Sequence, residues 1–146
     1  MRLELTRRGD YAVRAMLALG RATRDGRLSV PAIAGDMAIP VAFLPQVMRD
    51  LVAAGLIEGI TGRAGGYRLS RPAPRISVLE IVEAVEGDSR PSTCVLRGGP
   101  CGRDGQCDAH EVFFAARAAM LDRLRSATLA DLVRRDSQIA ATSLPE

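Results

Sequence analysis

Three cysteines and the chain's only histidine lie close together in the sequence, at Cys94, Cys101, Cys107 and His110. Thiolates and imidazoles are metal ligands, and four of them can hold a tetrahedral zinc ion. Three soft thiolates also suit an iron–sulfur cluster, in which a histidine can replace a cysteine on one iron. The spacers of six, five and two residues differ from the closely spaced cysteine pairs of common zinc sites. The long, glycine-rich spacers favour a cluster, and zinc remains the alternative.

Cys107 and His110 stand three residues apart, where a long helix is predicted to begin. Residues at this spacing share a helix face, so both side chains can serve one site. The amino end of a helix also favours bound negative charge. Two plainer interpretations compete with a metal site. The cysteines could be free thiols in a surface loop, or His110 could have a purely structural role.

The cysteine content also bears on the cellular compartment. An odd number of cysteines leaves one thiol over in any disulfide pattern, and clustered cysteines in a reducing compartment indicate a metal or redox site. No apolar run approaches the length of a membrane span. The opening MRLELTRRGD lacks the apolar stretch of a secretory signal. We therefore expect a cytoplasmic protein, and the length of 146 residues favours one continuous domain per subunit.

Hydrophobic periodicity predicts several helices and one β-hairpin. The helical segments carry apolar residues three and four positions apart, and most follow a residue that can cap a helix. These segments cover residues 6–22, 29–38, 41–54, 77–86 and 109–125, and a short one starts at 128. Apolar segments on either side of Ala64-Gly65-Gly66 predict the hairpin. The expected fold class is mainly α with a small β-hairpin wing.

Pro45 lies near the start of the third predicted helix. A proline costs about 3 kcal/mol in a helix interior but little in the first turn, where amide hydrogens lack partners. Either this helix begins late, near Ala42, or its first turn is distorted. We favour the late start.

Helix, short helix, turn, helix and hairpin follow one another in the order of a winged helix-turn-helix. In that motif the second helix of the pair enters the major groove of DNA and offers its first side chains to the bases. Here those side chains are Val41, Ala42, Phe43 and Gln46. Glutamine can pair with adenine, and a small or aromatic side chain can contact a thymine methyl group. Arg49, one turn further on, suits a phosphate.

Arg63 lies close to the tip of the predicted hairpin, where an arginine can enter a narrow minor groove. Ser29, Gly65 and Gly66 complete the predicted DNA-binding set, because they border the second helix and the hairpin turn. Helix-turn-helix patterns also occur in proteins that bind no DNA. In that case Phe43 would belong to the core and Gln46 to the solvated surface.

Charge is unevenly distributed along the chain. Residues 1–75 contain twelve arginines and six acidic residues, whereas residues 76–146 contain eight arginines and eleven acidic residues. A basic segment next to an acidic one is typical of a nucleic-acid-binding region joined to a region with another task. We therefore divide the chain into a DNA-binding region at 1–75 and a second region at 76–146, with the cysteine loop at about 91–108.

The predicted helix at 109–125 is apolar on two faces. The two sets of apolar residues are Phe113, Ala116, Met120 and Leu124, and Phe114, Ala118 and Leu121. A helix that is apolar on two sides must pack against two surfaces. In a chain this small, the second surface is expected to come from a partner subunit.

Taken together, these segments resemble the Rrf-type family of bacterial transcription regulators, which includes IscR, NsrR and RirA. The likeness covers nearly the whole chain. It rests on RRGDYAVRAM, LVAAGLIEGITGRAGGYRLSRP, ISVLEIVEAVEG, TLADLV and the Cys-x6-Cys-x5-Cys-x2-His pattern. The first cysteine spacer is one residue longer than the family pattern, and its RGGP sequence can accommodate the extra residue.

The resemblance implies a homodimer whose 109–125 helices cross between subunits, and DNA binding through the 41–54 helix and Arg63. It also implies an iron–sulfur cluster on Cys94, Cys101 and Cys107. IscR-like members add a histidine and bind a 2Fe–2S cluster, and His110 matches that position. NsrR-like members can instead use an acidic residue in the first helix of the other subunit, with a 4Fe–4S cluster, and Asp10 matches that one. We favour His110 and 2Fe–2S.

The sequence thus predicts a dimeric regulator in which a cluster senses redox state, iron supply or nitric oxide and controls the affinity for DNA. The alternative is a zinc-stabilised DNA-binding regulator that senses nothing. An enzyme is not expected, because the sequence has no Cys-x2-Cys motif and no phosphate-binding loop, and His110 has no evident catalytic partner.

Overall fold

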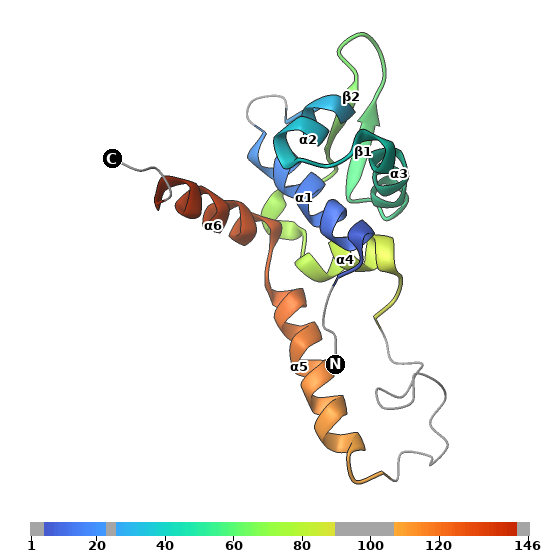
Figure 1. The fold of residues 1–146 in the computed structure, drawn as a ribbon, viewed down its shortest axis with the longest axis vertical. Helices are drawn as coiled ribbons and strands as arrows, with labels where there is room; N and C mark the ends of the chain where they lie inside the picture. Colours follow the sequence, from blue (N-terminus) through green and yellow to red (C-terminus); the bar gives the residue numbers. More distant parts are fainter. Residues whose placement is uncertain (1–4, 23–25, 90–106, 143–146) are drawn as a thin grey trace.

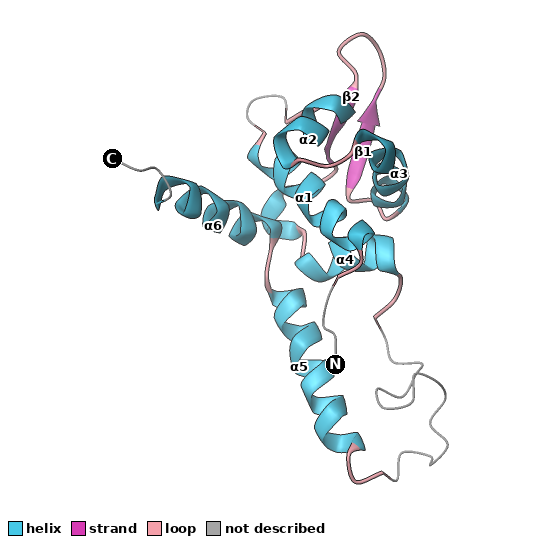
Figure 2. Cartoon of the chain, in the orientation of Figure 1, coloured by secondary structure: helices cyan, strands magenta, loops and turns pink. Residues whose placement is uncertain are grey.

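The computed structural model describes residues 5–22, 26–89 and 107–142. The elements are α1 (Arg7–Arg21), α2 (Val30–Met37), the 3-10 turn η1 (Val41–Phe43), α3 (Leu44–Ala53), β1 (Ile57–Ile60), β2 (Gly66–Leu69), the 3-10 turn η2 (Ala73–Arg75), α4 (Val78–Glu86), α5 (His110–Ser126) and α6 (Leu129–Thr142). The first four α-helices and the hairpin form one body, from which α5 and α6 extend in different directions (Figures 1 and 2). The predicted fold class, mainly α with a β-hairpin, is confirmed.

Several helices begin after a residue whose side chain can cap them, as predicted for most of the helical segments. Thr6 Oγ1 accepts a hydrogen bond from the amide of Gly9 at 3.2 Å, and Ser29 Oγ accepts one from the amide of Ala32 at 3.3 Å. At the start of α6, Thr128 Oγ1 accepts one from the amide of Asp131 at 3.2 Å. Each cap satisfies an amide that the helix leaves unpaired, and contributes about 1 kcal/mol. The last helix was predicted to be short, but α6 contains 14 residues.

The third helix begins differently from the prediction. The chain forms the 3-10 turn η1 at Val41–Phe43, and the α-helix starts at Leu44, with Pro45 in its first turn. The expected start near Ala42 is therefore wrong, and the distorted first turn describes the segment better. The physical reason holds for both alternatives, because Pro45 occupies a position where no amide hydrogen is needed. After the helix, Gly55 has a φ of +72°, as expected of a glycine that ends a helix.

The hairpin pairs β1 with β2 in antiparallel register, from Ile57 opposite Leu69 to Ile60 opposite Gly66. Gly66 was predicted in the turn but is the first residue of β2, so residues 61–65 form the connection. No pattern in the sequence indicated that a third segment pairs with this hairpin. The amide of Tyr67 donates to the carbonyl of Leu28 at 2.8 Å, and the amide of Leu28 donates back at 2.9 Å. A Cβ at Gly66 would lie 2.4 Å from the Leu28 carbonyl oxygen, so this approach requires glycine.

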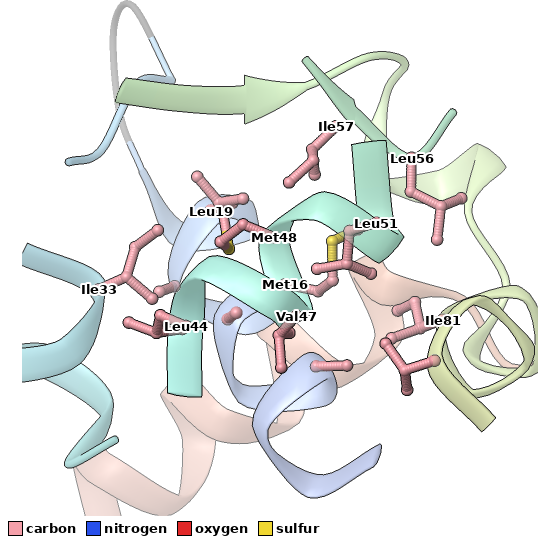
Figure 3. Close-up of a cluster of buried hydrophobic side chains, with 14 of the residues drawn as sticks. Met16, Leu19, Ile33, Leu44, Val47, Met48, Leu51, Leu56, Ile57 and Ile81 are labelled. Carbon is pink, nitrogen blue, oxygen red and sulfur yellow. The ribbon is translucent and has the colours of Figure 1, made fainter. Parts of the chain in front are cut away.

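The core lies where α1, α3 and α4 meet under the hairpin, as Figure 3 shows. Its largest fully buried side chains are Met16, Leu19, Ile33, Leu44, Val47, Met48, Leu51, Leu56, Ile57, Ile76, Ile81 and Leu129. Ile81 and Leu129 follow the predicted division at residue 75, yet they belong to the same cluster as the residues before it. The division of tasks between 1–75 and 76–146 stays a prediction, while the core runs across the boundary.

Helix α4 starts with a reciprocal pair of hydrogen bonds. Ser77 Oγ accepts from the amide of Glu80 at 3.2 Å, and Glu80 Oε2 accepts from the amide of Ser77 at 2.8 Å. The guanidinium of Arg71 lies against the other carboxylate oxygen. Burial raises the pKa of Glu80, but the hydrogen bonds from Ser77 and the charge of Arg71 outweigh it, so the pKa lies below its usual value. The ionised carboxylate therefore stabilises the fold.

Because the pKa of Glu80 is lowered in the folded chain, its contribution is present above the unfolded pKa of about 4.3 and is lost as the pH falls through the folded value. We expect Glu80→Gln to destabilise the protein by less than about 1 kcal/mol at pH 7, since the carboxylate is partly exposed. At pH 3 the difference should shrink. Thermal unfolding of both proteins at the two pH values checks this. An equal difference at both would contradict the assignment.

Helix α5 has no buried residue. Val112 is 69% exposed and Phe114 53% exposed, although both are apolar. In Figure 1 the helix extends away from the body, and only its later part approaches α4. The prediction that two faces of this helix need partners is consistent with this exposure. Every helix in the described segments is too short or too polar to cross a lipid bilayer.

Helix α6 packs on α1 and is tied to the body by one arginine. Nη1 of Arg21 lies 2.6 Å from Asp136 of α6, and Nη2 lies 2.6 Å from Asp36 of α2. A Cβ at Gly20 would lie 2.8 Å from the Val133 side chain, so the two helices approach closely there. The arginine connects three helices, and no pattern in the sequence indicated this connection.

Candidate DNA-binding surface and metal-binding loop

The residues predicted to contact DNA bases lie on an exposed surface at the start of α3. Val41 is 55% exposed and Phe43 48% exposed, and Ala42, Gln46 and Arg49 are exposed as well. The opposite face of α3 carries the core residues Leu44, Val47, Met48 and Leu51. The helix therefore packs on the body with one side and presents the predicted set with the other.

Phe43 is not a core residue, contrary to the plainer interpretation of its apolar character. Its ring lies against that of Tyr11 in α1, with centroids 5.7 Å apart. The guanidinium of Arg14 lies 5.9 Å from the centre of the Tyr11 ring. These contacts hold one edge of Phe43 and leave about half of it exposed. It can still contact an apolar group such as a thymine methyl.

Gln46 is held by a neighbour that the sequence did not single out. Its Nε2 donates to Asp50 Oδ1 at 2.9 Å, and the guanidinium of Arg8 in α1 donates to Asp50 Oδ2. Gln46 is exposed to solvent, as the alternative interpretation had it, and is also held by this hydrogen bond. The spacing of four residues on one helix could have indicated the contact between Gln46 and Asp50. Nothing in the sequence could have indicated Arg8.

Arg49 and Arg63 are exposed and, among the described residues, make no ion pair or side-chain hydrogen bond. Arg68 and Arg71 are instead paired with Glu58 and Glu80. Arg63 lies in the loop between β1 and β2. In Figure 1 that loop is at the end of the body opposite the start of α5. These two arginines are thus available to neutralise phosphates or enter a groove.

Ser29, Gly65 and Gly66 have structural roles that the structure makes plain. The hydroxyl of Ser29 caps α2, and Gly66 lies against Leu28. A Cβ at Gly65 would lie 2.7 Å from the carbonyl oxygen of Ile60. All three shape the hairpin and the helix pair. Their predicted contact with DNA stays a prediction.

Of the four predicted metal ligands, Cys107 and His110 lie in the described part, and Cys94 and Cys101 lie outside it. Cys107 is a free, half-buried cysteine. The amide of His110 donates to the carbonyl of Cys107 at 2.8 Å, which forms the turn that begins α5. The His110 ring is stacked on Phe114 at 5.7 Å. Both residues therefore stand at the amino end of the same helix, as predicted.

Within the described residues, no three cysteine, histidine or acidic side chains gather as a metal site. Two of the four predicted ligands fall outside those residues, so this finding concerns only the remaining two. The donor chemistry fits a soft metal site. A free thiol and an imidazole share one helix end, and that end favours the negative charge of thiolate-bound iron.

Asp10, the alternative fourth ligand, is already paired. Arg14 Nε donates to its Oδ1 at 3.0 Å, and Arg14 Nη2 lies 2.6 Å from its Oδ2. Both carboxylate oxygens thus face one guanidinium. A metal would have to displace this pair, whereas the imidazole of His110 has no hydrogen-bond partner among the described residues.

A helix pair whose second helix has an exposed face, followed by a hairpin with an arginine in its loop, defines the winged helix-turn-helix class, whose DNA-binding members place that second helix in the major groove. The chain belongs to the Rrf2 family, described as iron-dependent transcriptional regulators, and the match covers residues 5–135. The family resemblance drawn from the sequence is thereby confirmed.

Individual relatives support the same assignment. The transcriptional regulator IscR of Xenorhabdus nematophila is 31% identical over 132 residues, which cover 90% of this chain and 80% of that protein. The structure of CymR, the global cysteine regulator of B. subtilis, matches with a TM-score of 0.80 and 27% identity, over 92% of this chain and 98% of that one. The structure of IscR of T. potens matches with a TM-score of 0.74 and 25% identity, over 99% of this chain and 93% of that one.

The protein is therefore a DNA-binding transcription regulator and not an enzyme, because its family and its relatives are regulators. The family is described as iron-dependent, and two of the similar proteins carry the name IscR.

Proposed function

We propose that this protein is a homodimeric, cytoplasmic regulator that binds operator DNA and carries an iron–sulfur cluster on Cys94, Cys101, Cys107 and His110. The observation that carries the proposal is the position of Cys107 and His110 together at the amino end of α5, outside the core. A metal bound there can be gained or lost without unfolding the body. The cluster favoured is 2Fe–2S, because His110 is available and Asp10 is paired with Arg14.

Residues 1–75 would contact DNA. The start of α3 would enter the major groove with Val41, Ala42, Phe43 and Gln46, and Arg49 would bind a phosphate. Arg63 would enter the adjacent minor groove, with Ser29, Gly65 and Gly66 shaping the nearby backbone. Residues 76–146 would supply the cluster loop and the helices that join the subunits.

An iron–sulfur cluster, when bound, supplies a group that responds to oxidants, nitric oxide or iron supply. The chain offers two sets of contacts through which a shift of α5 could reach α4 and α2. The amide of Val78 donates to the carbonyl of Ala127 at 2.9 Å, and the amide of Leu129 donates to that of Ile76 at 2.8 Å. The second set is the bridge from Asp136 through Arg21 to α2.

For such a shift to act as a switch, the bound cluster must favour one arrangement by a few kcal/mol. Gel-shift titrations of the holoprotein and the apoprotein at matched salt test this directly, since salt alone changes DNA affinity strongly. We expect affinities that differ by about tenfold or more. Equal affinities would contradict sensing and leave a DNA-binding protein with a structural metal.

The dimer is expected to form through α5, whose apolar residues are exposed. We expect the double variant Phe114→Glu and Met120→Glu to be monomeric, because charges would be buried between the subunits. Analytical ultracentrifugation gives the mass, and circular dichroism checks the fold. The matched control is Ala119→Glu, since Ala119 is exposed on the same helix and lies on neither apolar face. A monomeric wild-type protein would contradict the interface.

A further inference from the structure

Asp50 accepts hydrogen bonds from two side chains of different helices. Nε2 of Gln46, one turn earlier in α3, donates to its Oδ1 at 2.9 Å. The guanidinium of Arg8, in α1, donates to its Oδ2. The Asp50 side chain is 20% exposed, whereas that of Arg8 is 51% exposed. Both oxygens of a largely sheltered carboxylate are therefore committed.

This arrangement fixes the direction of the Gln46 amide. An ionised carboxylate can only accept hydrogen bonds, so Gln46 must turn its NH2 group toward Asp50 and its Oε1 away from it. The orientation follows from the chemistry of the pair, since the reversed amide would place two acceptors against each other. Gln46 then offers outward one acceptor, Oε1, and the remaining hydrogen of Nε2.

We propose that Asp50, anchored by Arg8, is a positioning residue that sets the base preference of Gln46. This inference rests on the proposed function, in which the start of α3 enters the major groove. An outward acceptor selects bases that present an amino group there, which are adenine through N6 and cytosine through N4. Guanine, with N7 and O6, and thymine, with O4, present only acceptors in that groove, so neither can pair with the outward Oε1 and both are disfavoured.

Arg8 has a second effect in the same arrangement. A bare carboxylate on a DNA-facing helix would repel the phosphates, which carry a dense negative charge. The guanidinium of Arg8 offsets that charge and holds the carboxylate in place. Arg8 and Asp50 thus influence recognition without either of them contacting a base.

The substitution Asp50→Asn tests the proposal. It keeps the shape of the side chain and replaces one acceptor oxygen of the carboxylate with an NH2 donor. Arg8 still requires an acceptor, so the introduced amide would turn its oxygen to Arg8 and its NH2 group to Gln46. Gln46 would then accept with Oε1 and point Nε2 outward. An outward donor favours bases that present only acceptors, which are guanine and thymine. We therefore expect the variant to change its preference from adenine or cytosine toward guanine or thymine at one position of each half-site.

Selection from a random duplex pool gives the preferred site of the wild-type protein, Asp50→Asn and Gln46→Ala. Binding titrations on duplexes that differ at one base pair then give affinity ratios, which are insensitive to the general gain in affinity when a negative charge is removed. Compared with the wild-type protein, we expect the ratio of affinities for the two duplexes to change by about tenfold in Asp50→Asn. The change should occur at the base pair where Gln46→Ala also loses its preference. The matched control is Asp122→Asn, which removes an equal charge from α5 and should leave the ratio unchanged. Melting temperatures check that all variants are folded.

The outcomes separate the inference from the proposed function. If Gln46→Ala relaxes one position and Asp50→Asn does not, Gln46 reads the base without help from Asp50, and the inference is wrong. If neither variant changes the preference, the bases are read elsewhere, and the inference is wrong while operator binding stands. If the wild-type protein selects no sequence, the proposed operator binding fails, and the inference fails with it.

Discussion

Replacing Cys107 with alanine is expected to abolish cluster binding while the protein stays folded. The thiolate is one of four proposed ligands, and a cluster does not remain bound when a cysteine ligand is lost. The side chain lies outside the buried core, at the start of a helix that has no buried residue. The change in melting temperature of the apoprotein should therefore be less than about 4 °C.

Iron and sulfide analysis of the anaerobically purified variant, together with circular dichroism, measures both halves of this prediction. The matched control is Asp108→Ala, because Asp108 is the exposed neighbour of Cys107 and is not among the proposed ligands. It should retain iron and sulfide. A Cys107→Ala protein that fails to fold would indicate a structural site. A variant that keeps its full iron content would remove Cys107 from the ligand set.

Replacing Arg63 with alanine is expected to weaken binding to operator DNA by about 1–3 kcal/mol. The side chain lies in the loop between the strands and is exposed, with no ion pair among the described residues. It is therefore free to enter a groove or bind a phosphate. If it binds only a phosphate, the loss should be similar on all sequences, and the salt dependence of binding should decrease by about one unit of slope.

Fluorescence anisotropy titrations at several salt concentrations distinguish these two modes. The matched control is Arg134→Ala, which removes the same charge from an exposed position of α6. It should change the affinity much less than Arg63→Ala does. Equal losses in the two variants would mean that net charge alone matters, and no loss in either would remove the hairpin from the DNA-binding surface.

The sequence predicted the elements that depend on local pattern. Thr6, Ser29 and Ser77 cap their helices because a hydroxyl before an apolar period satisfies free amides. The start of α3 was predicted less well. Pro45 is tolerated throughout the first turn, so it does not fix where the helix begins, and the local pattern did not indicate the 3-10 turn at Val41–Phe43. The pairing of Leu28 with Tyr67 was also missed, because one isolated bridge leaves no periodic pattern.

The metal-binding side chains and the exposed arginines of the candidate sites could be predicted from the sequence. The ion pairs that join different helices could not. Cys107 and His110 were recognised from residue type and spacing, because both can be read directly from the sequence. The contacts from Arg8 to Asp50 and from Arg21 to Asp136 join residues far apart in the chain. Their formation depends on how α1 packs against α3 and α6. Such pairs become visible only when the helices are placed in space.

The position of the two sites shapes how regulation would operate. The hairpin loop and the amino end of α5 lie at opposite ends of the molecule in Figure 1. A metal at one end cannot touch DNA at the other. Control of DNA affinity therefore requires a change in the placement of helices, and the bridge through Arg21 is one connection available for it.

The most direct test of the account is metal and sulfide analysis, with a visible absorption spectrum, on protein purified without oxygen. The account predicts a coloured protein with about two iron and two sulfide per subunit, as expected for a 2Fe–2S cluster with His110 as a ligand. About four iron per subunit would contradict the choice of His110 and favour Asp10. A colourless protein with one zinc per subunit would contradict the cluster itself and establish a structural metal in a DNA-binding regulator.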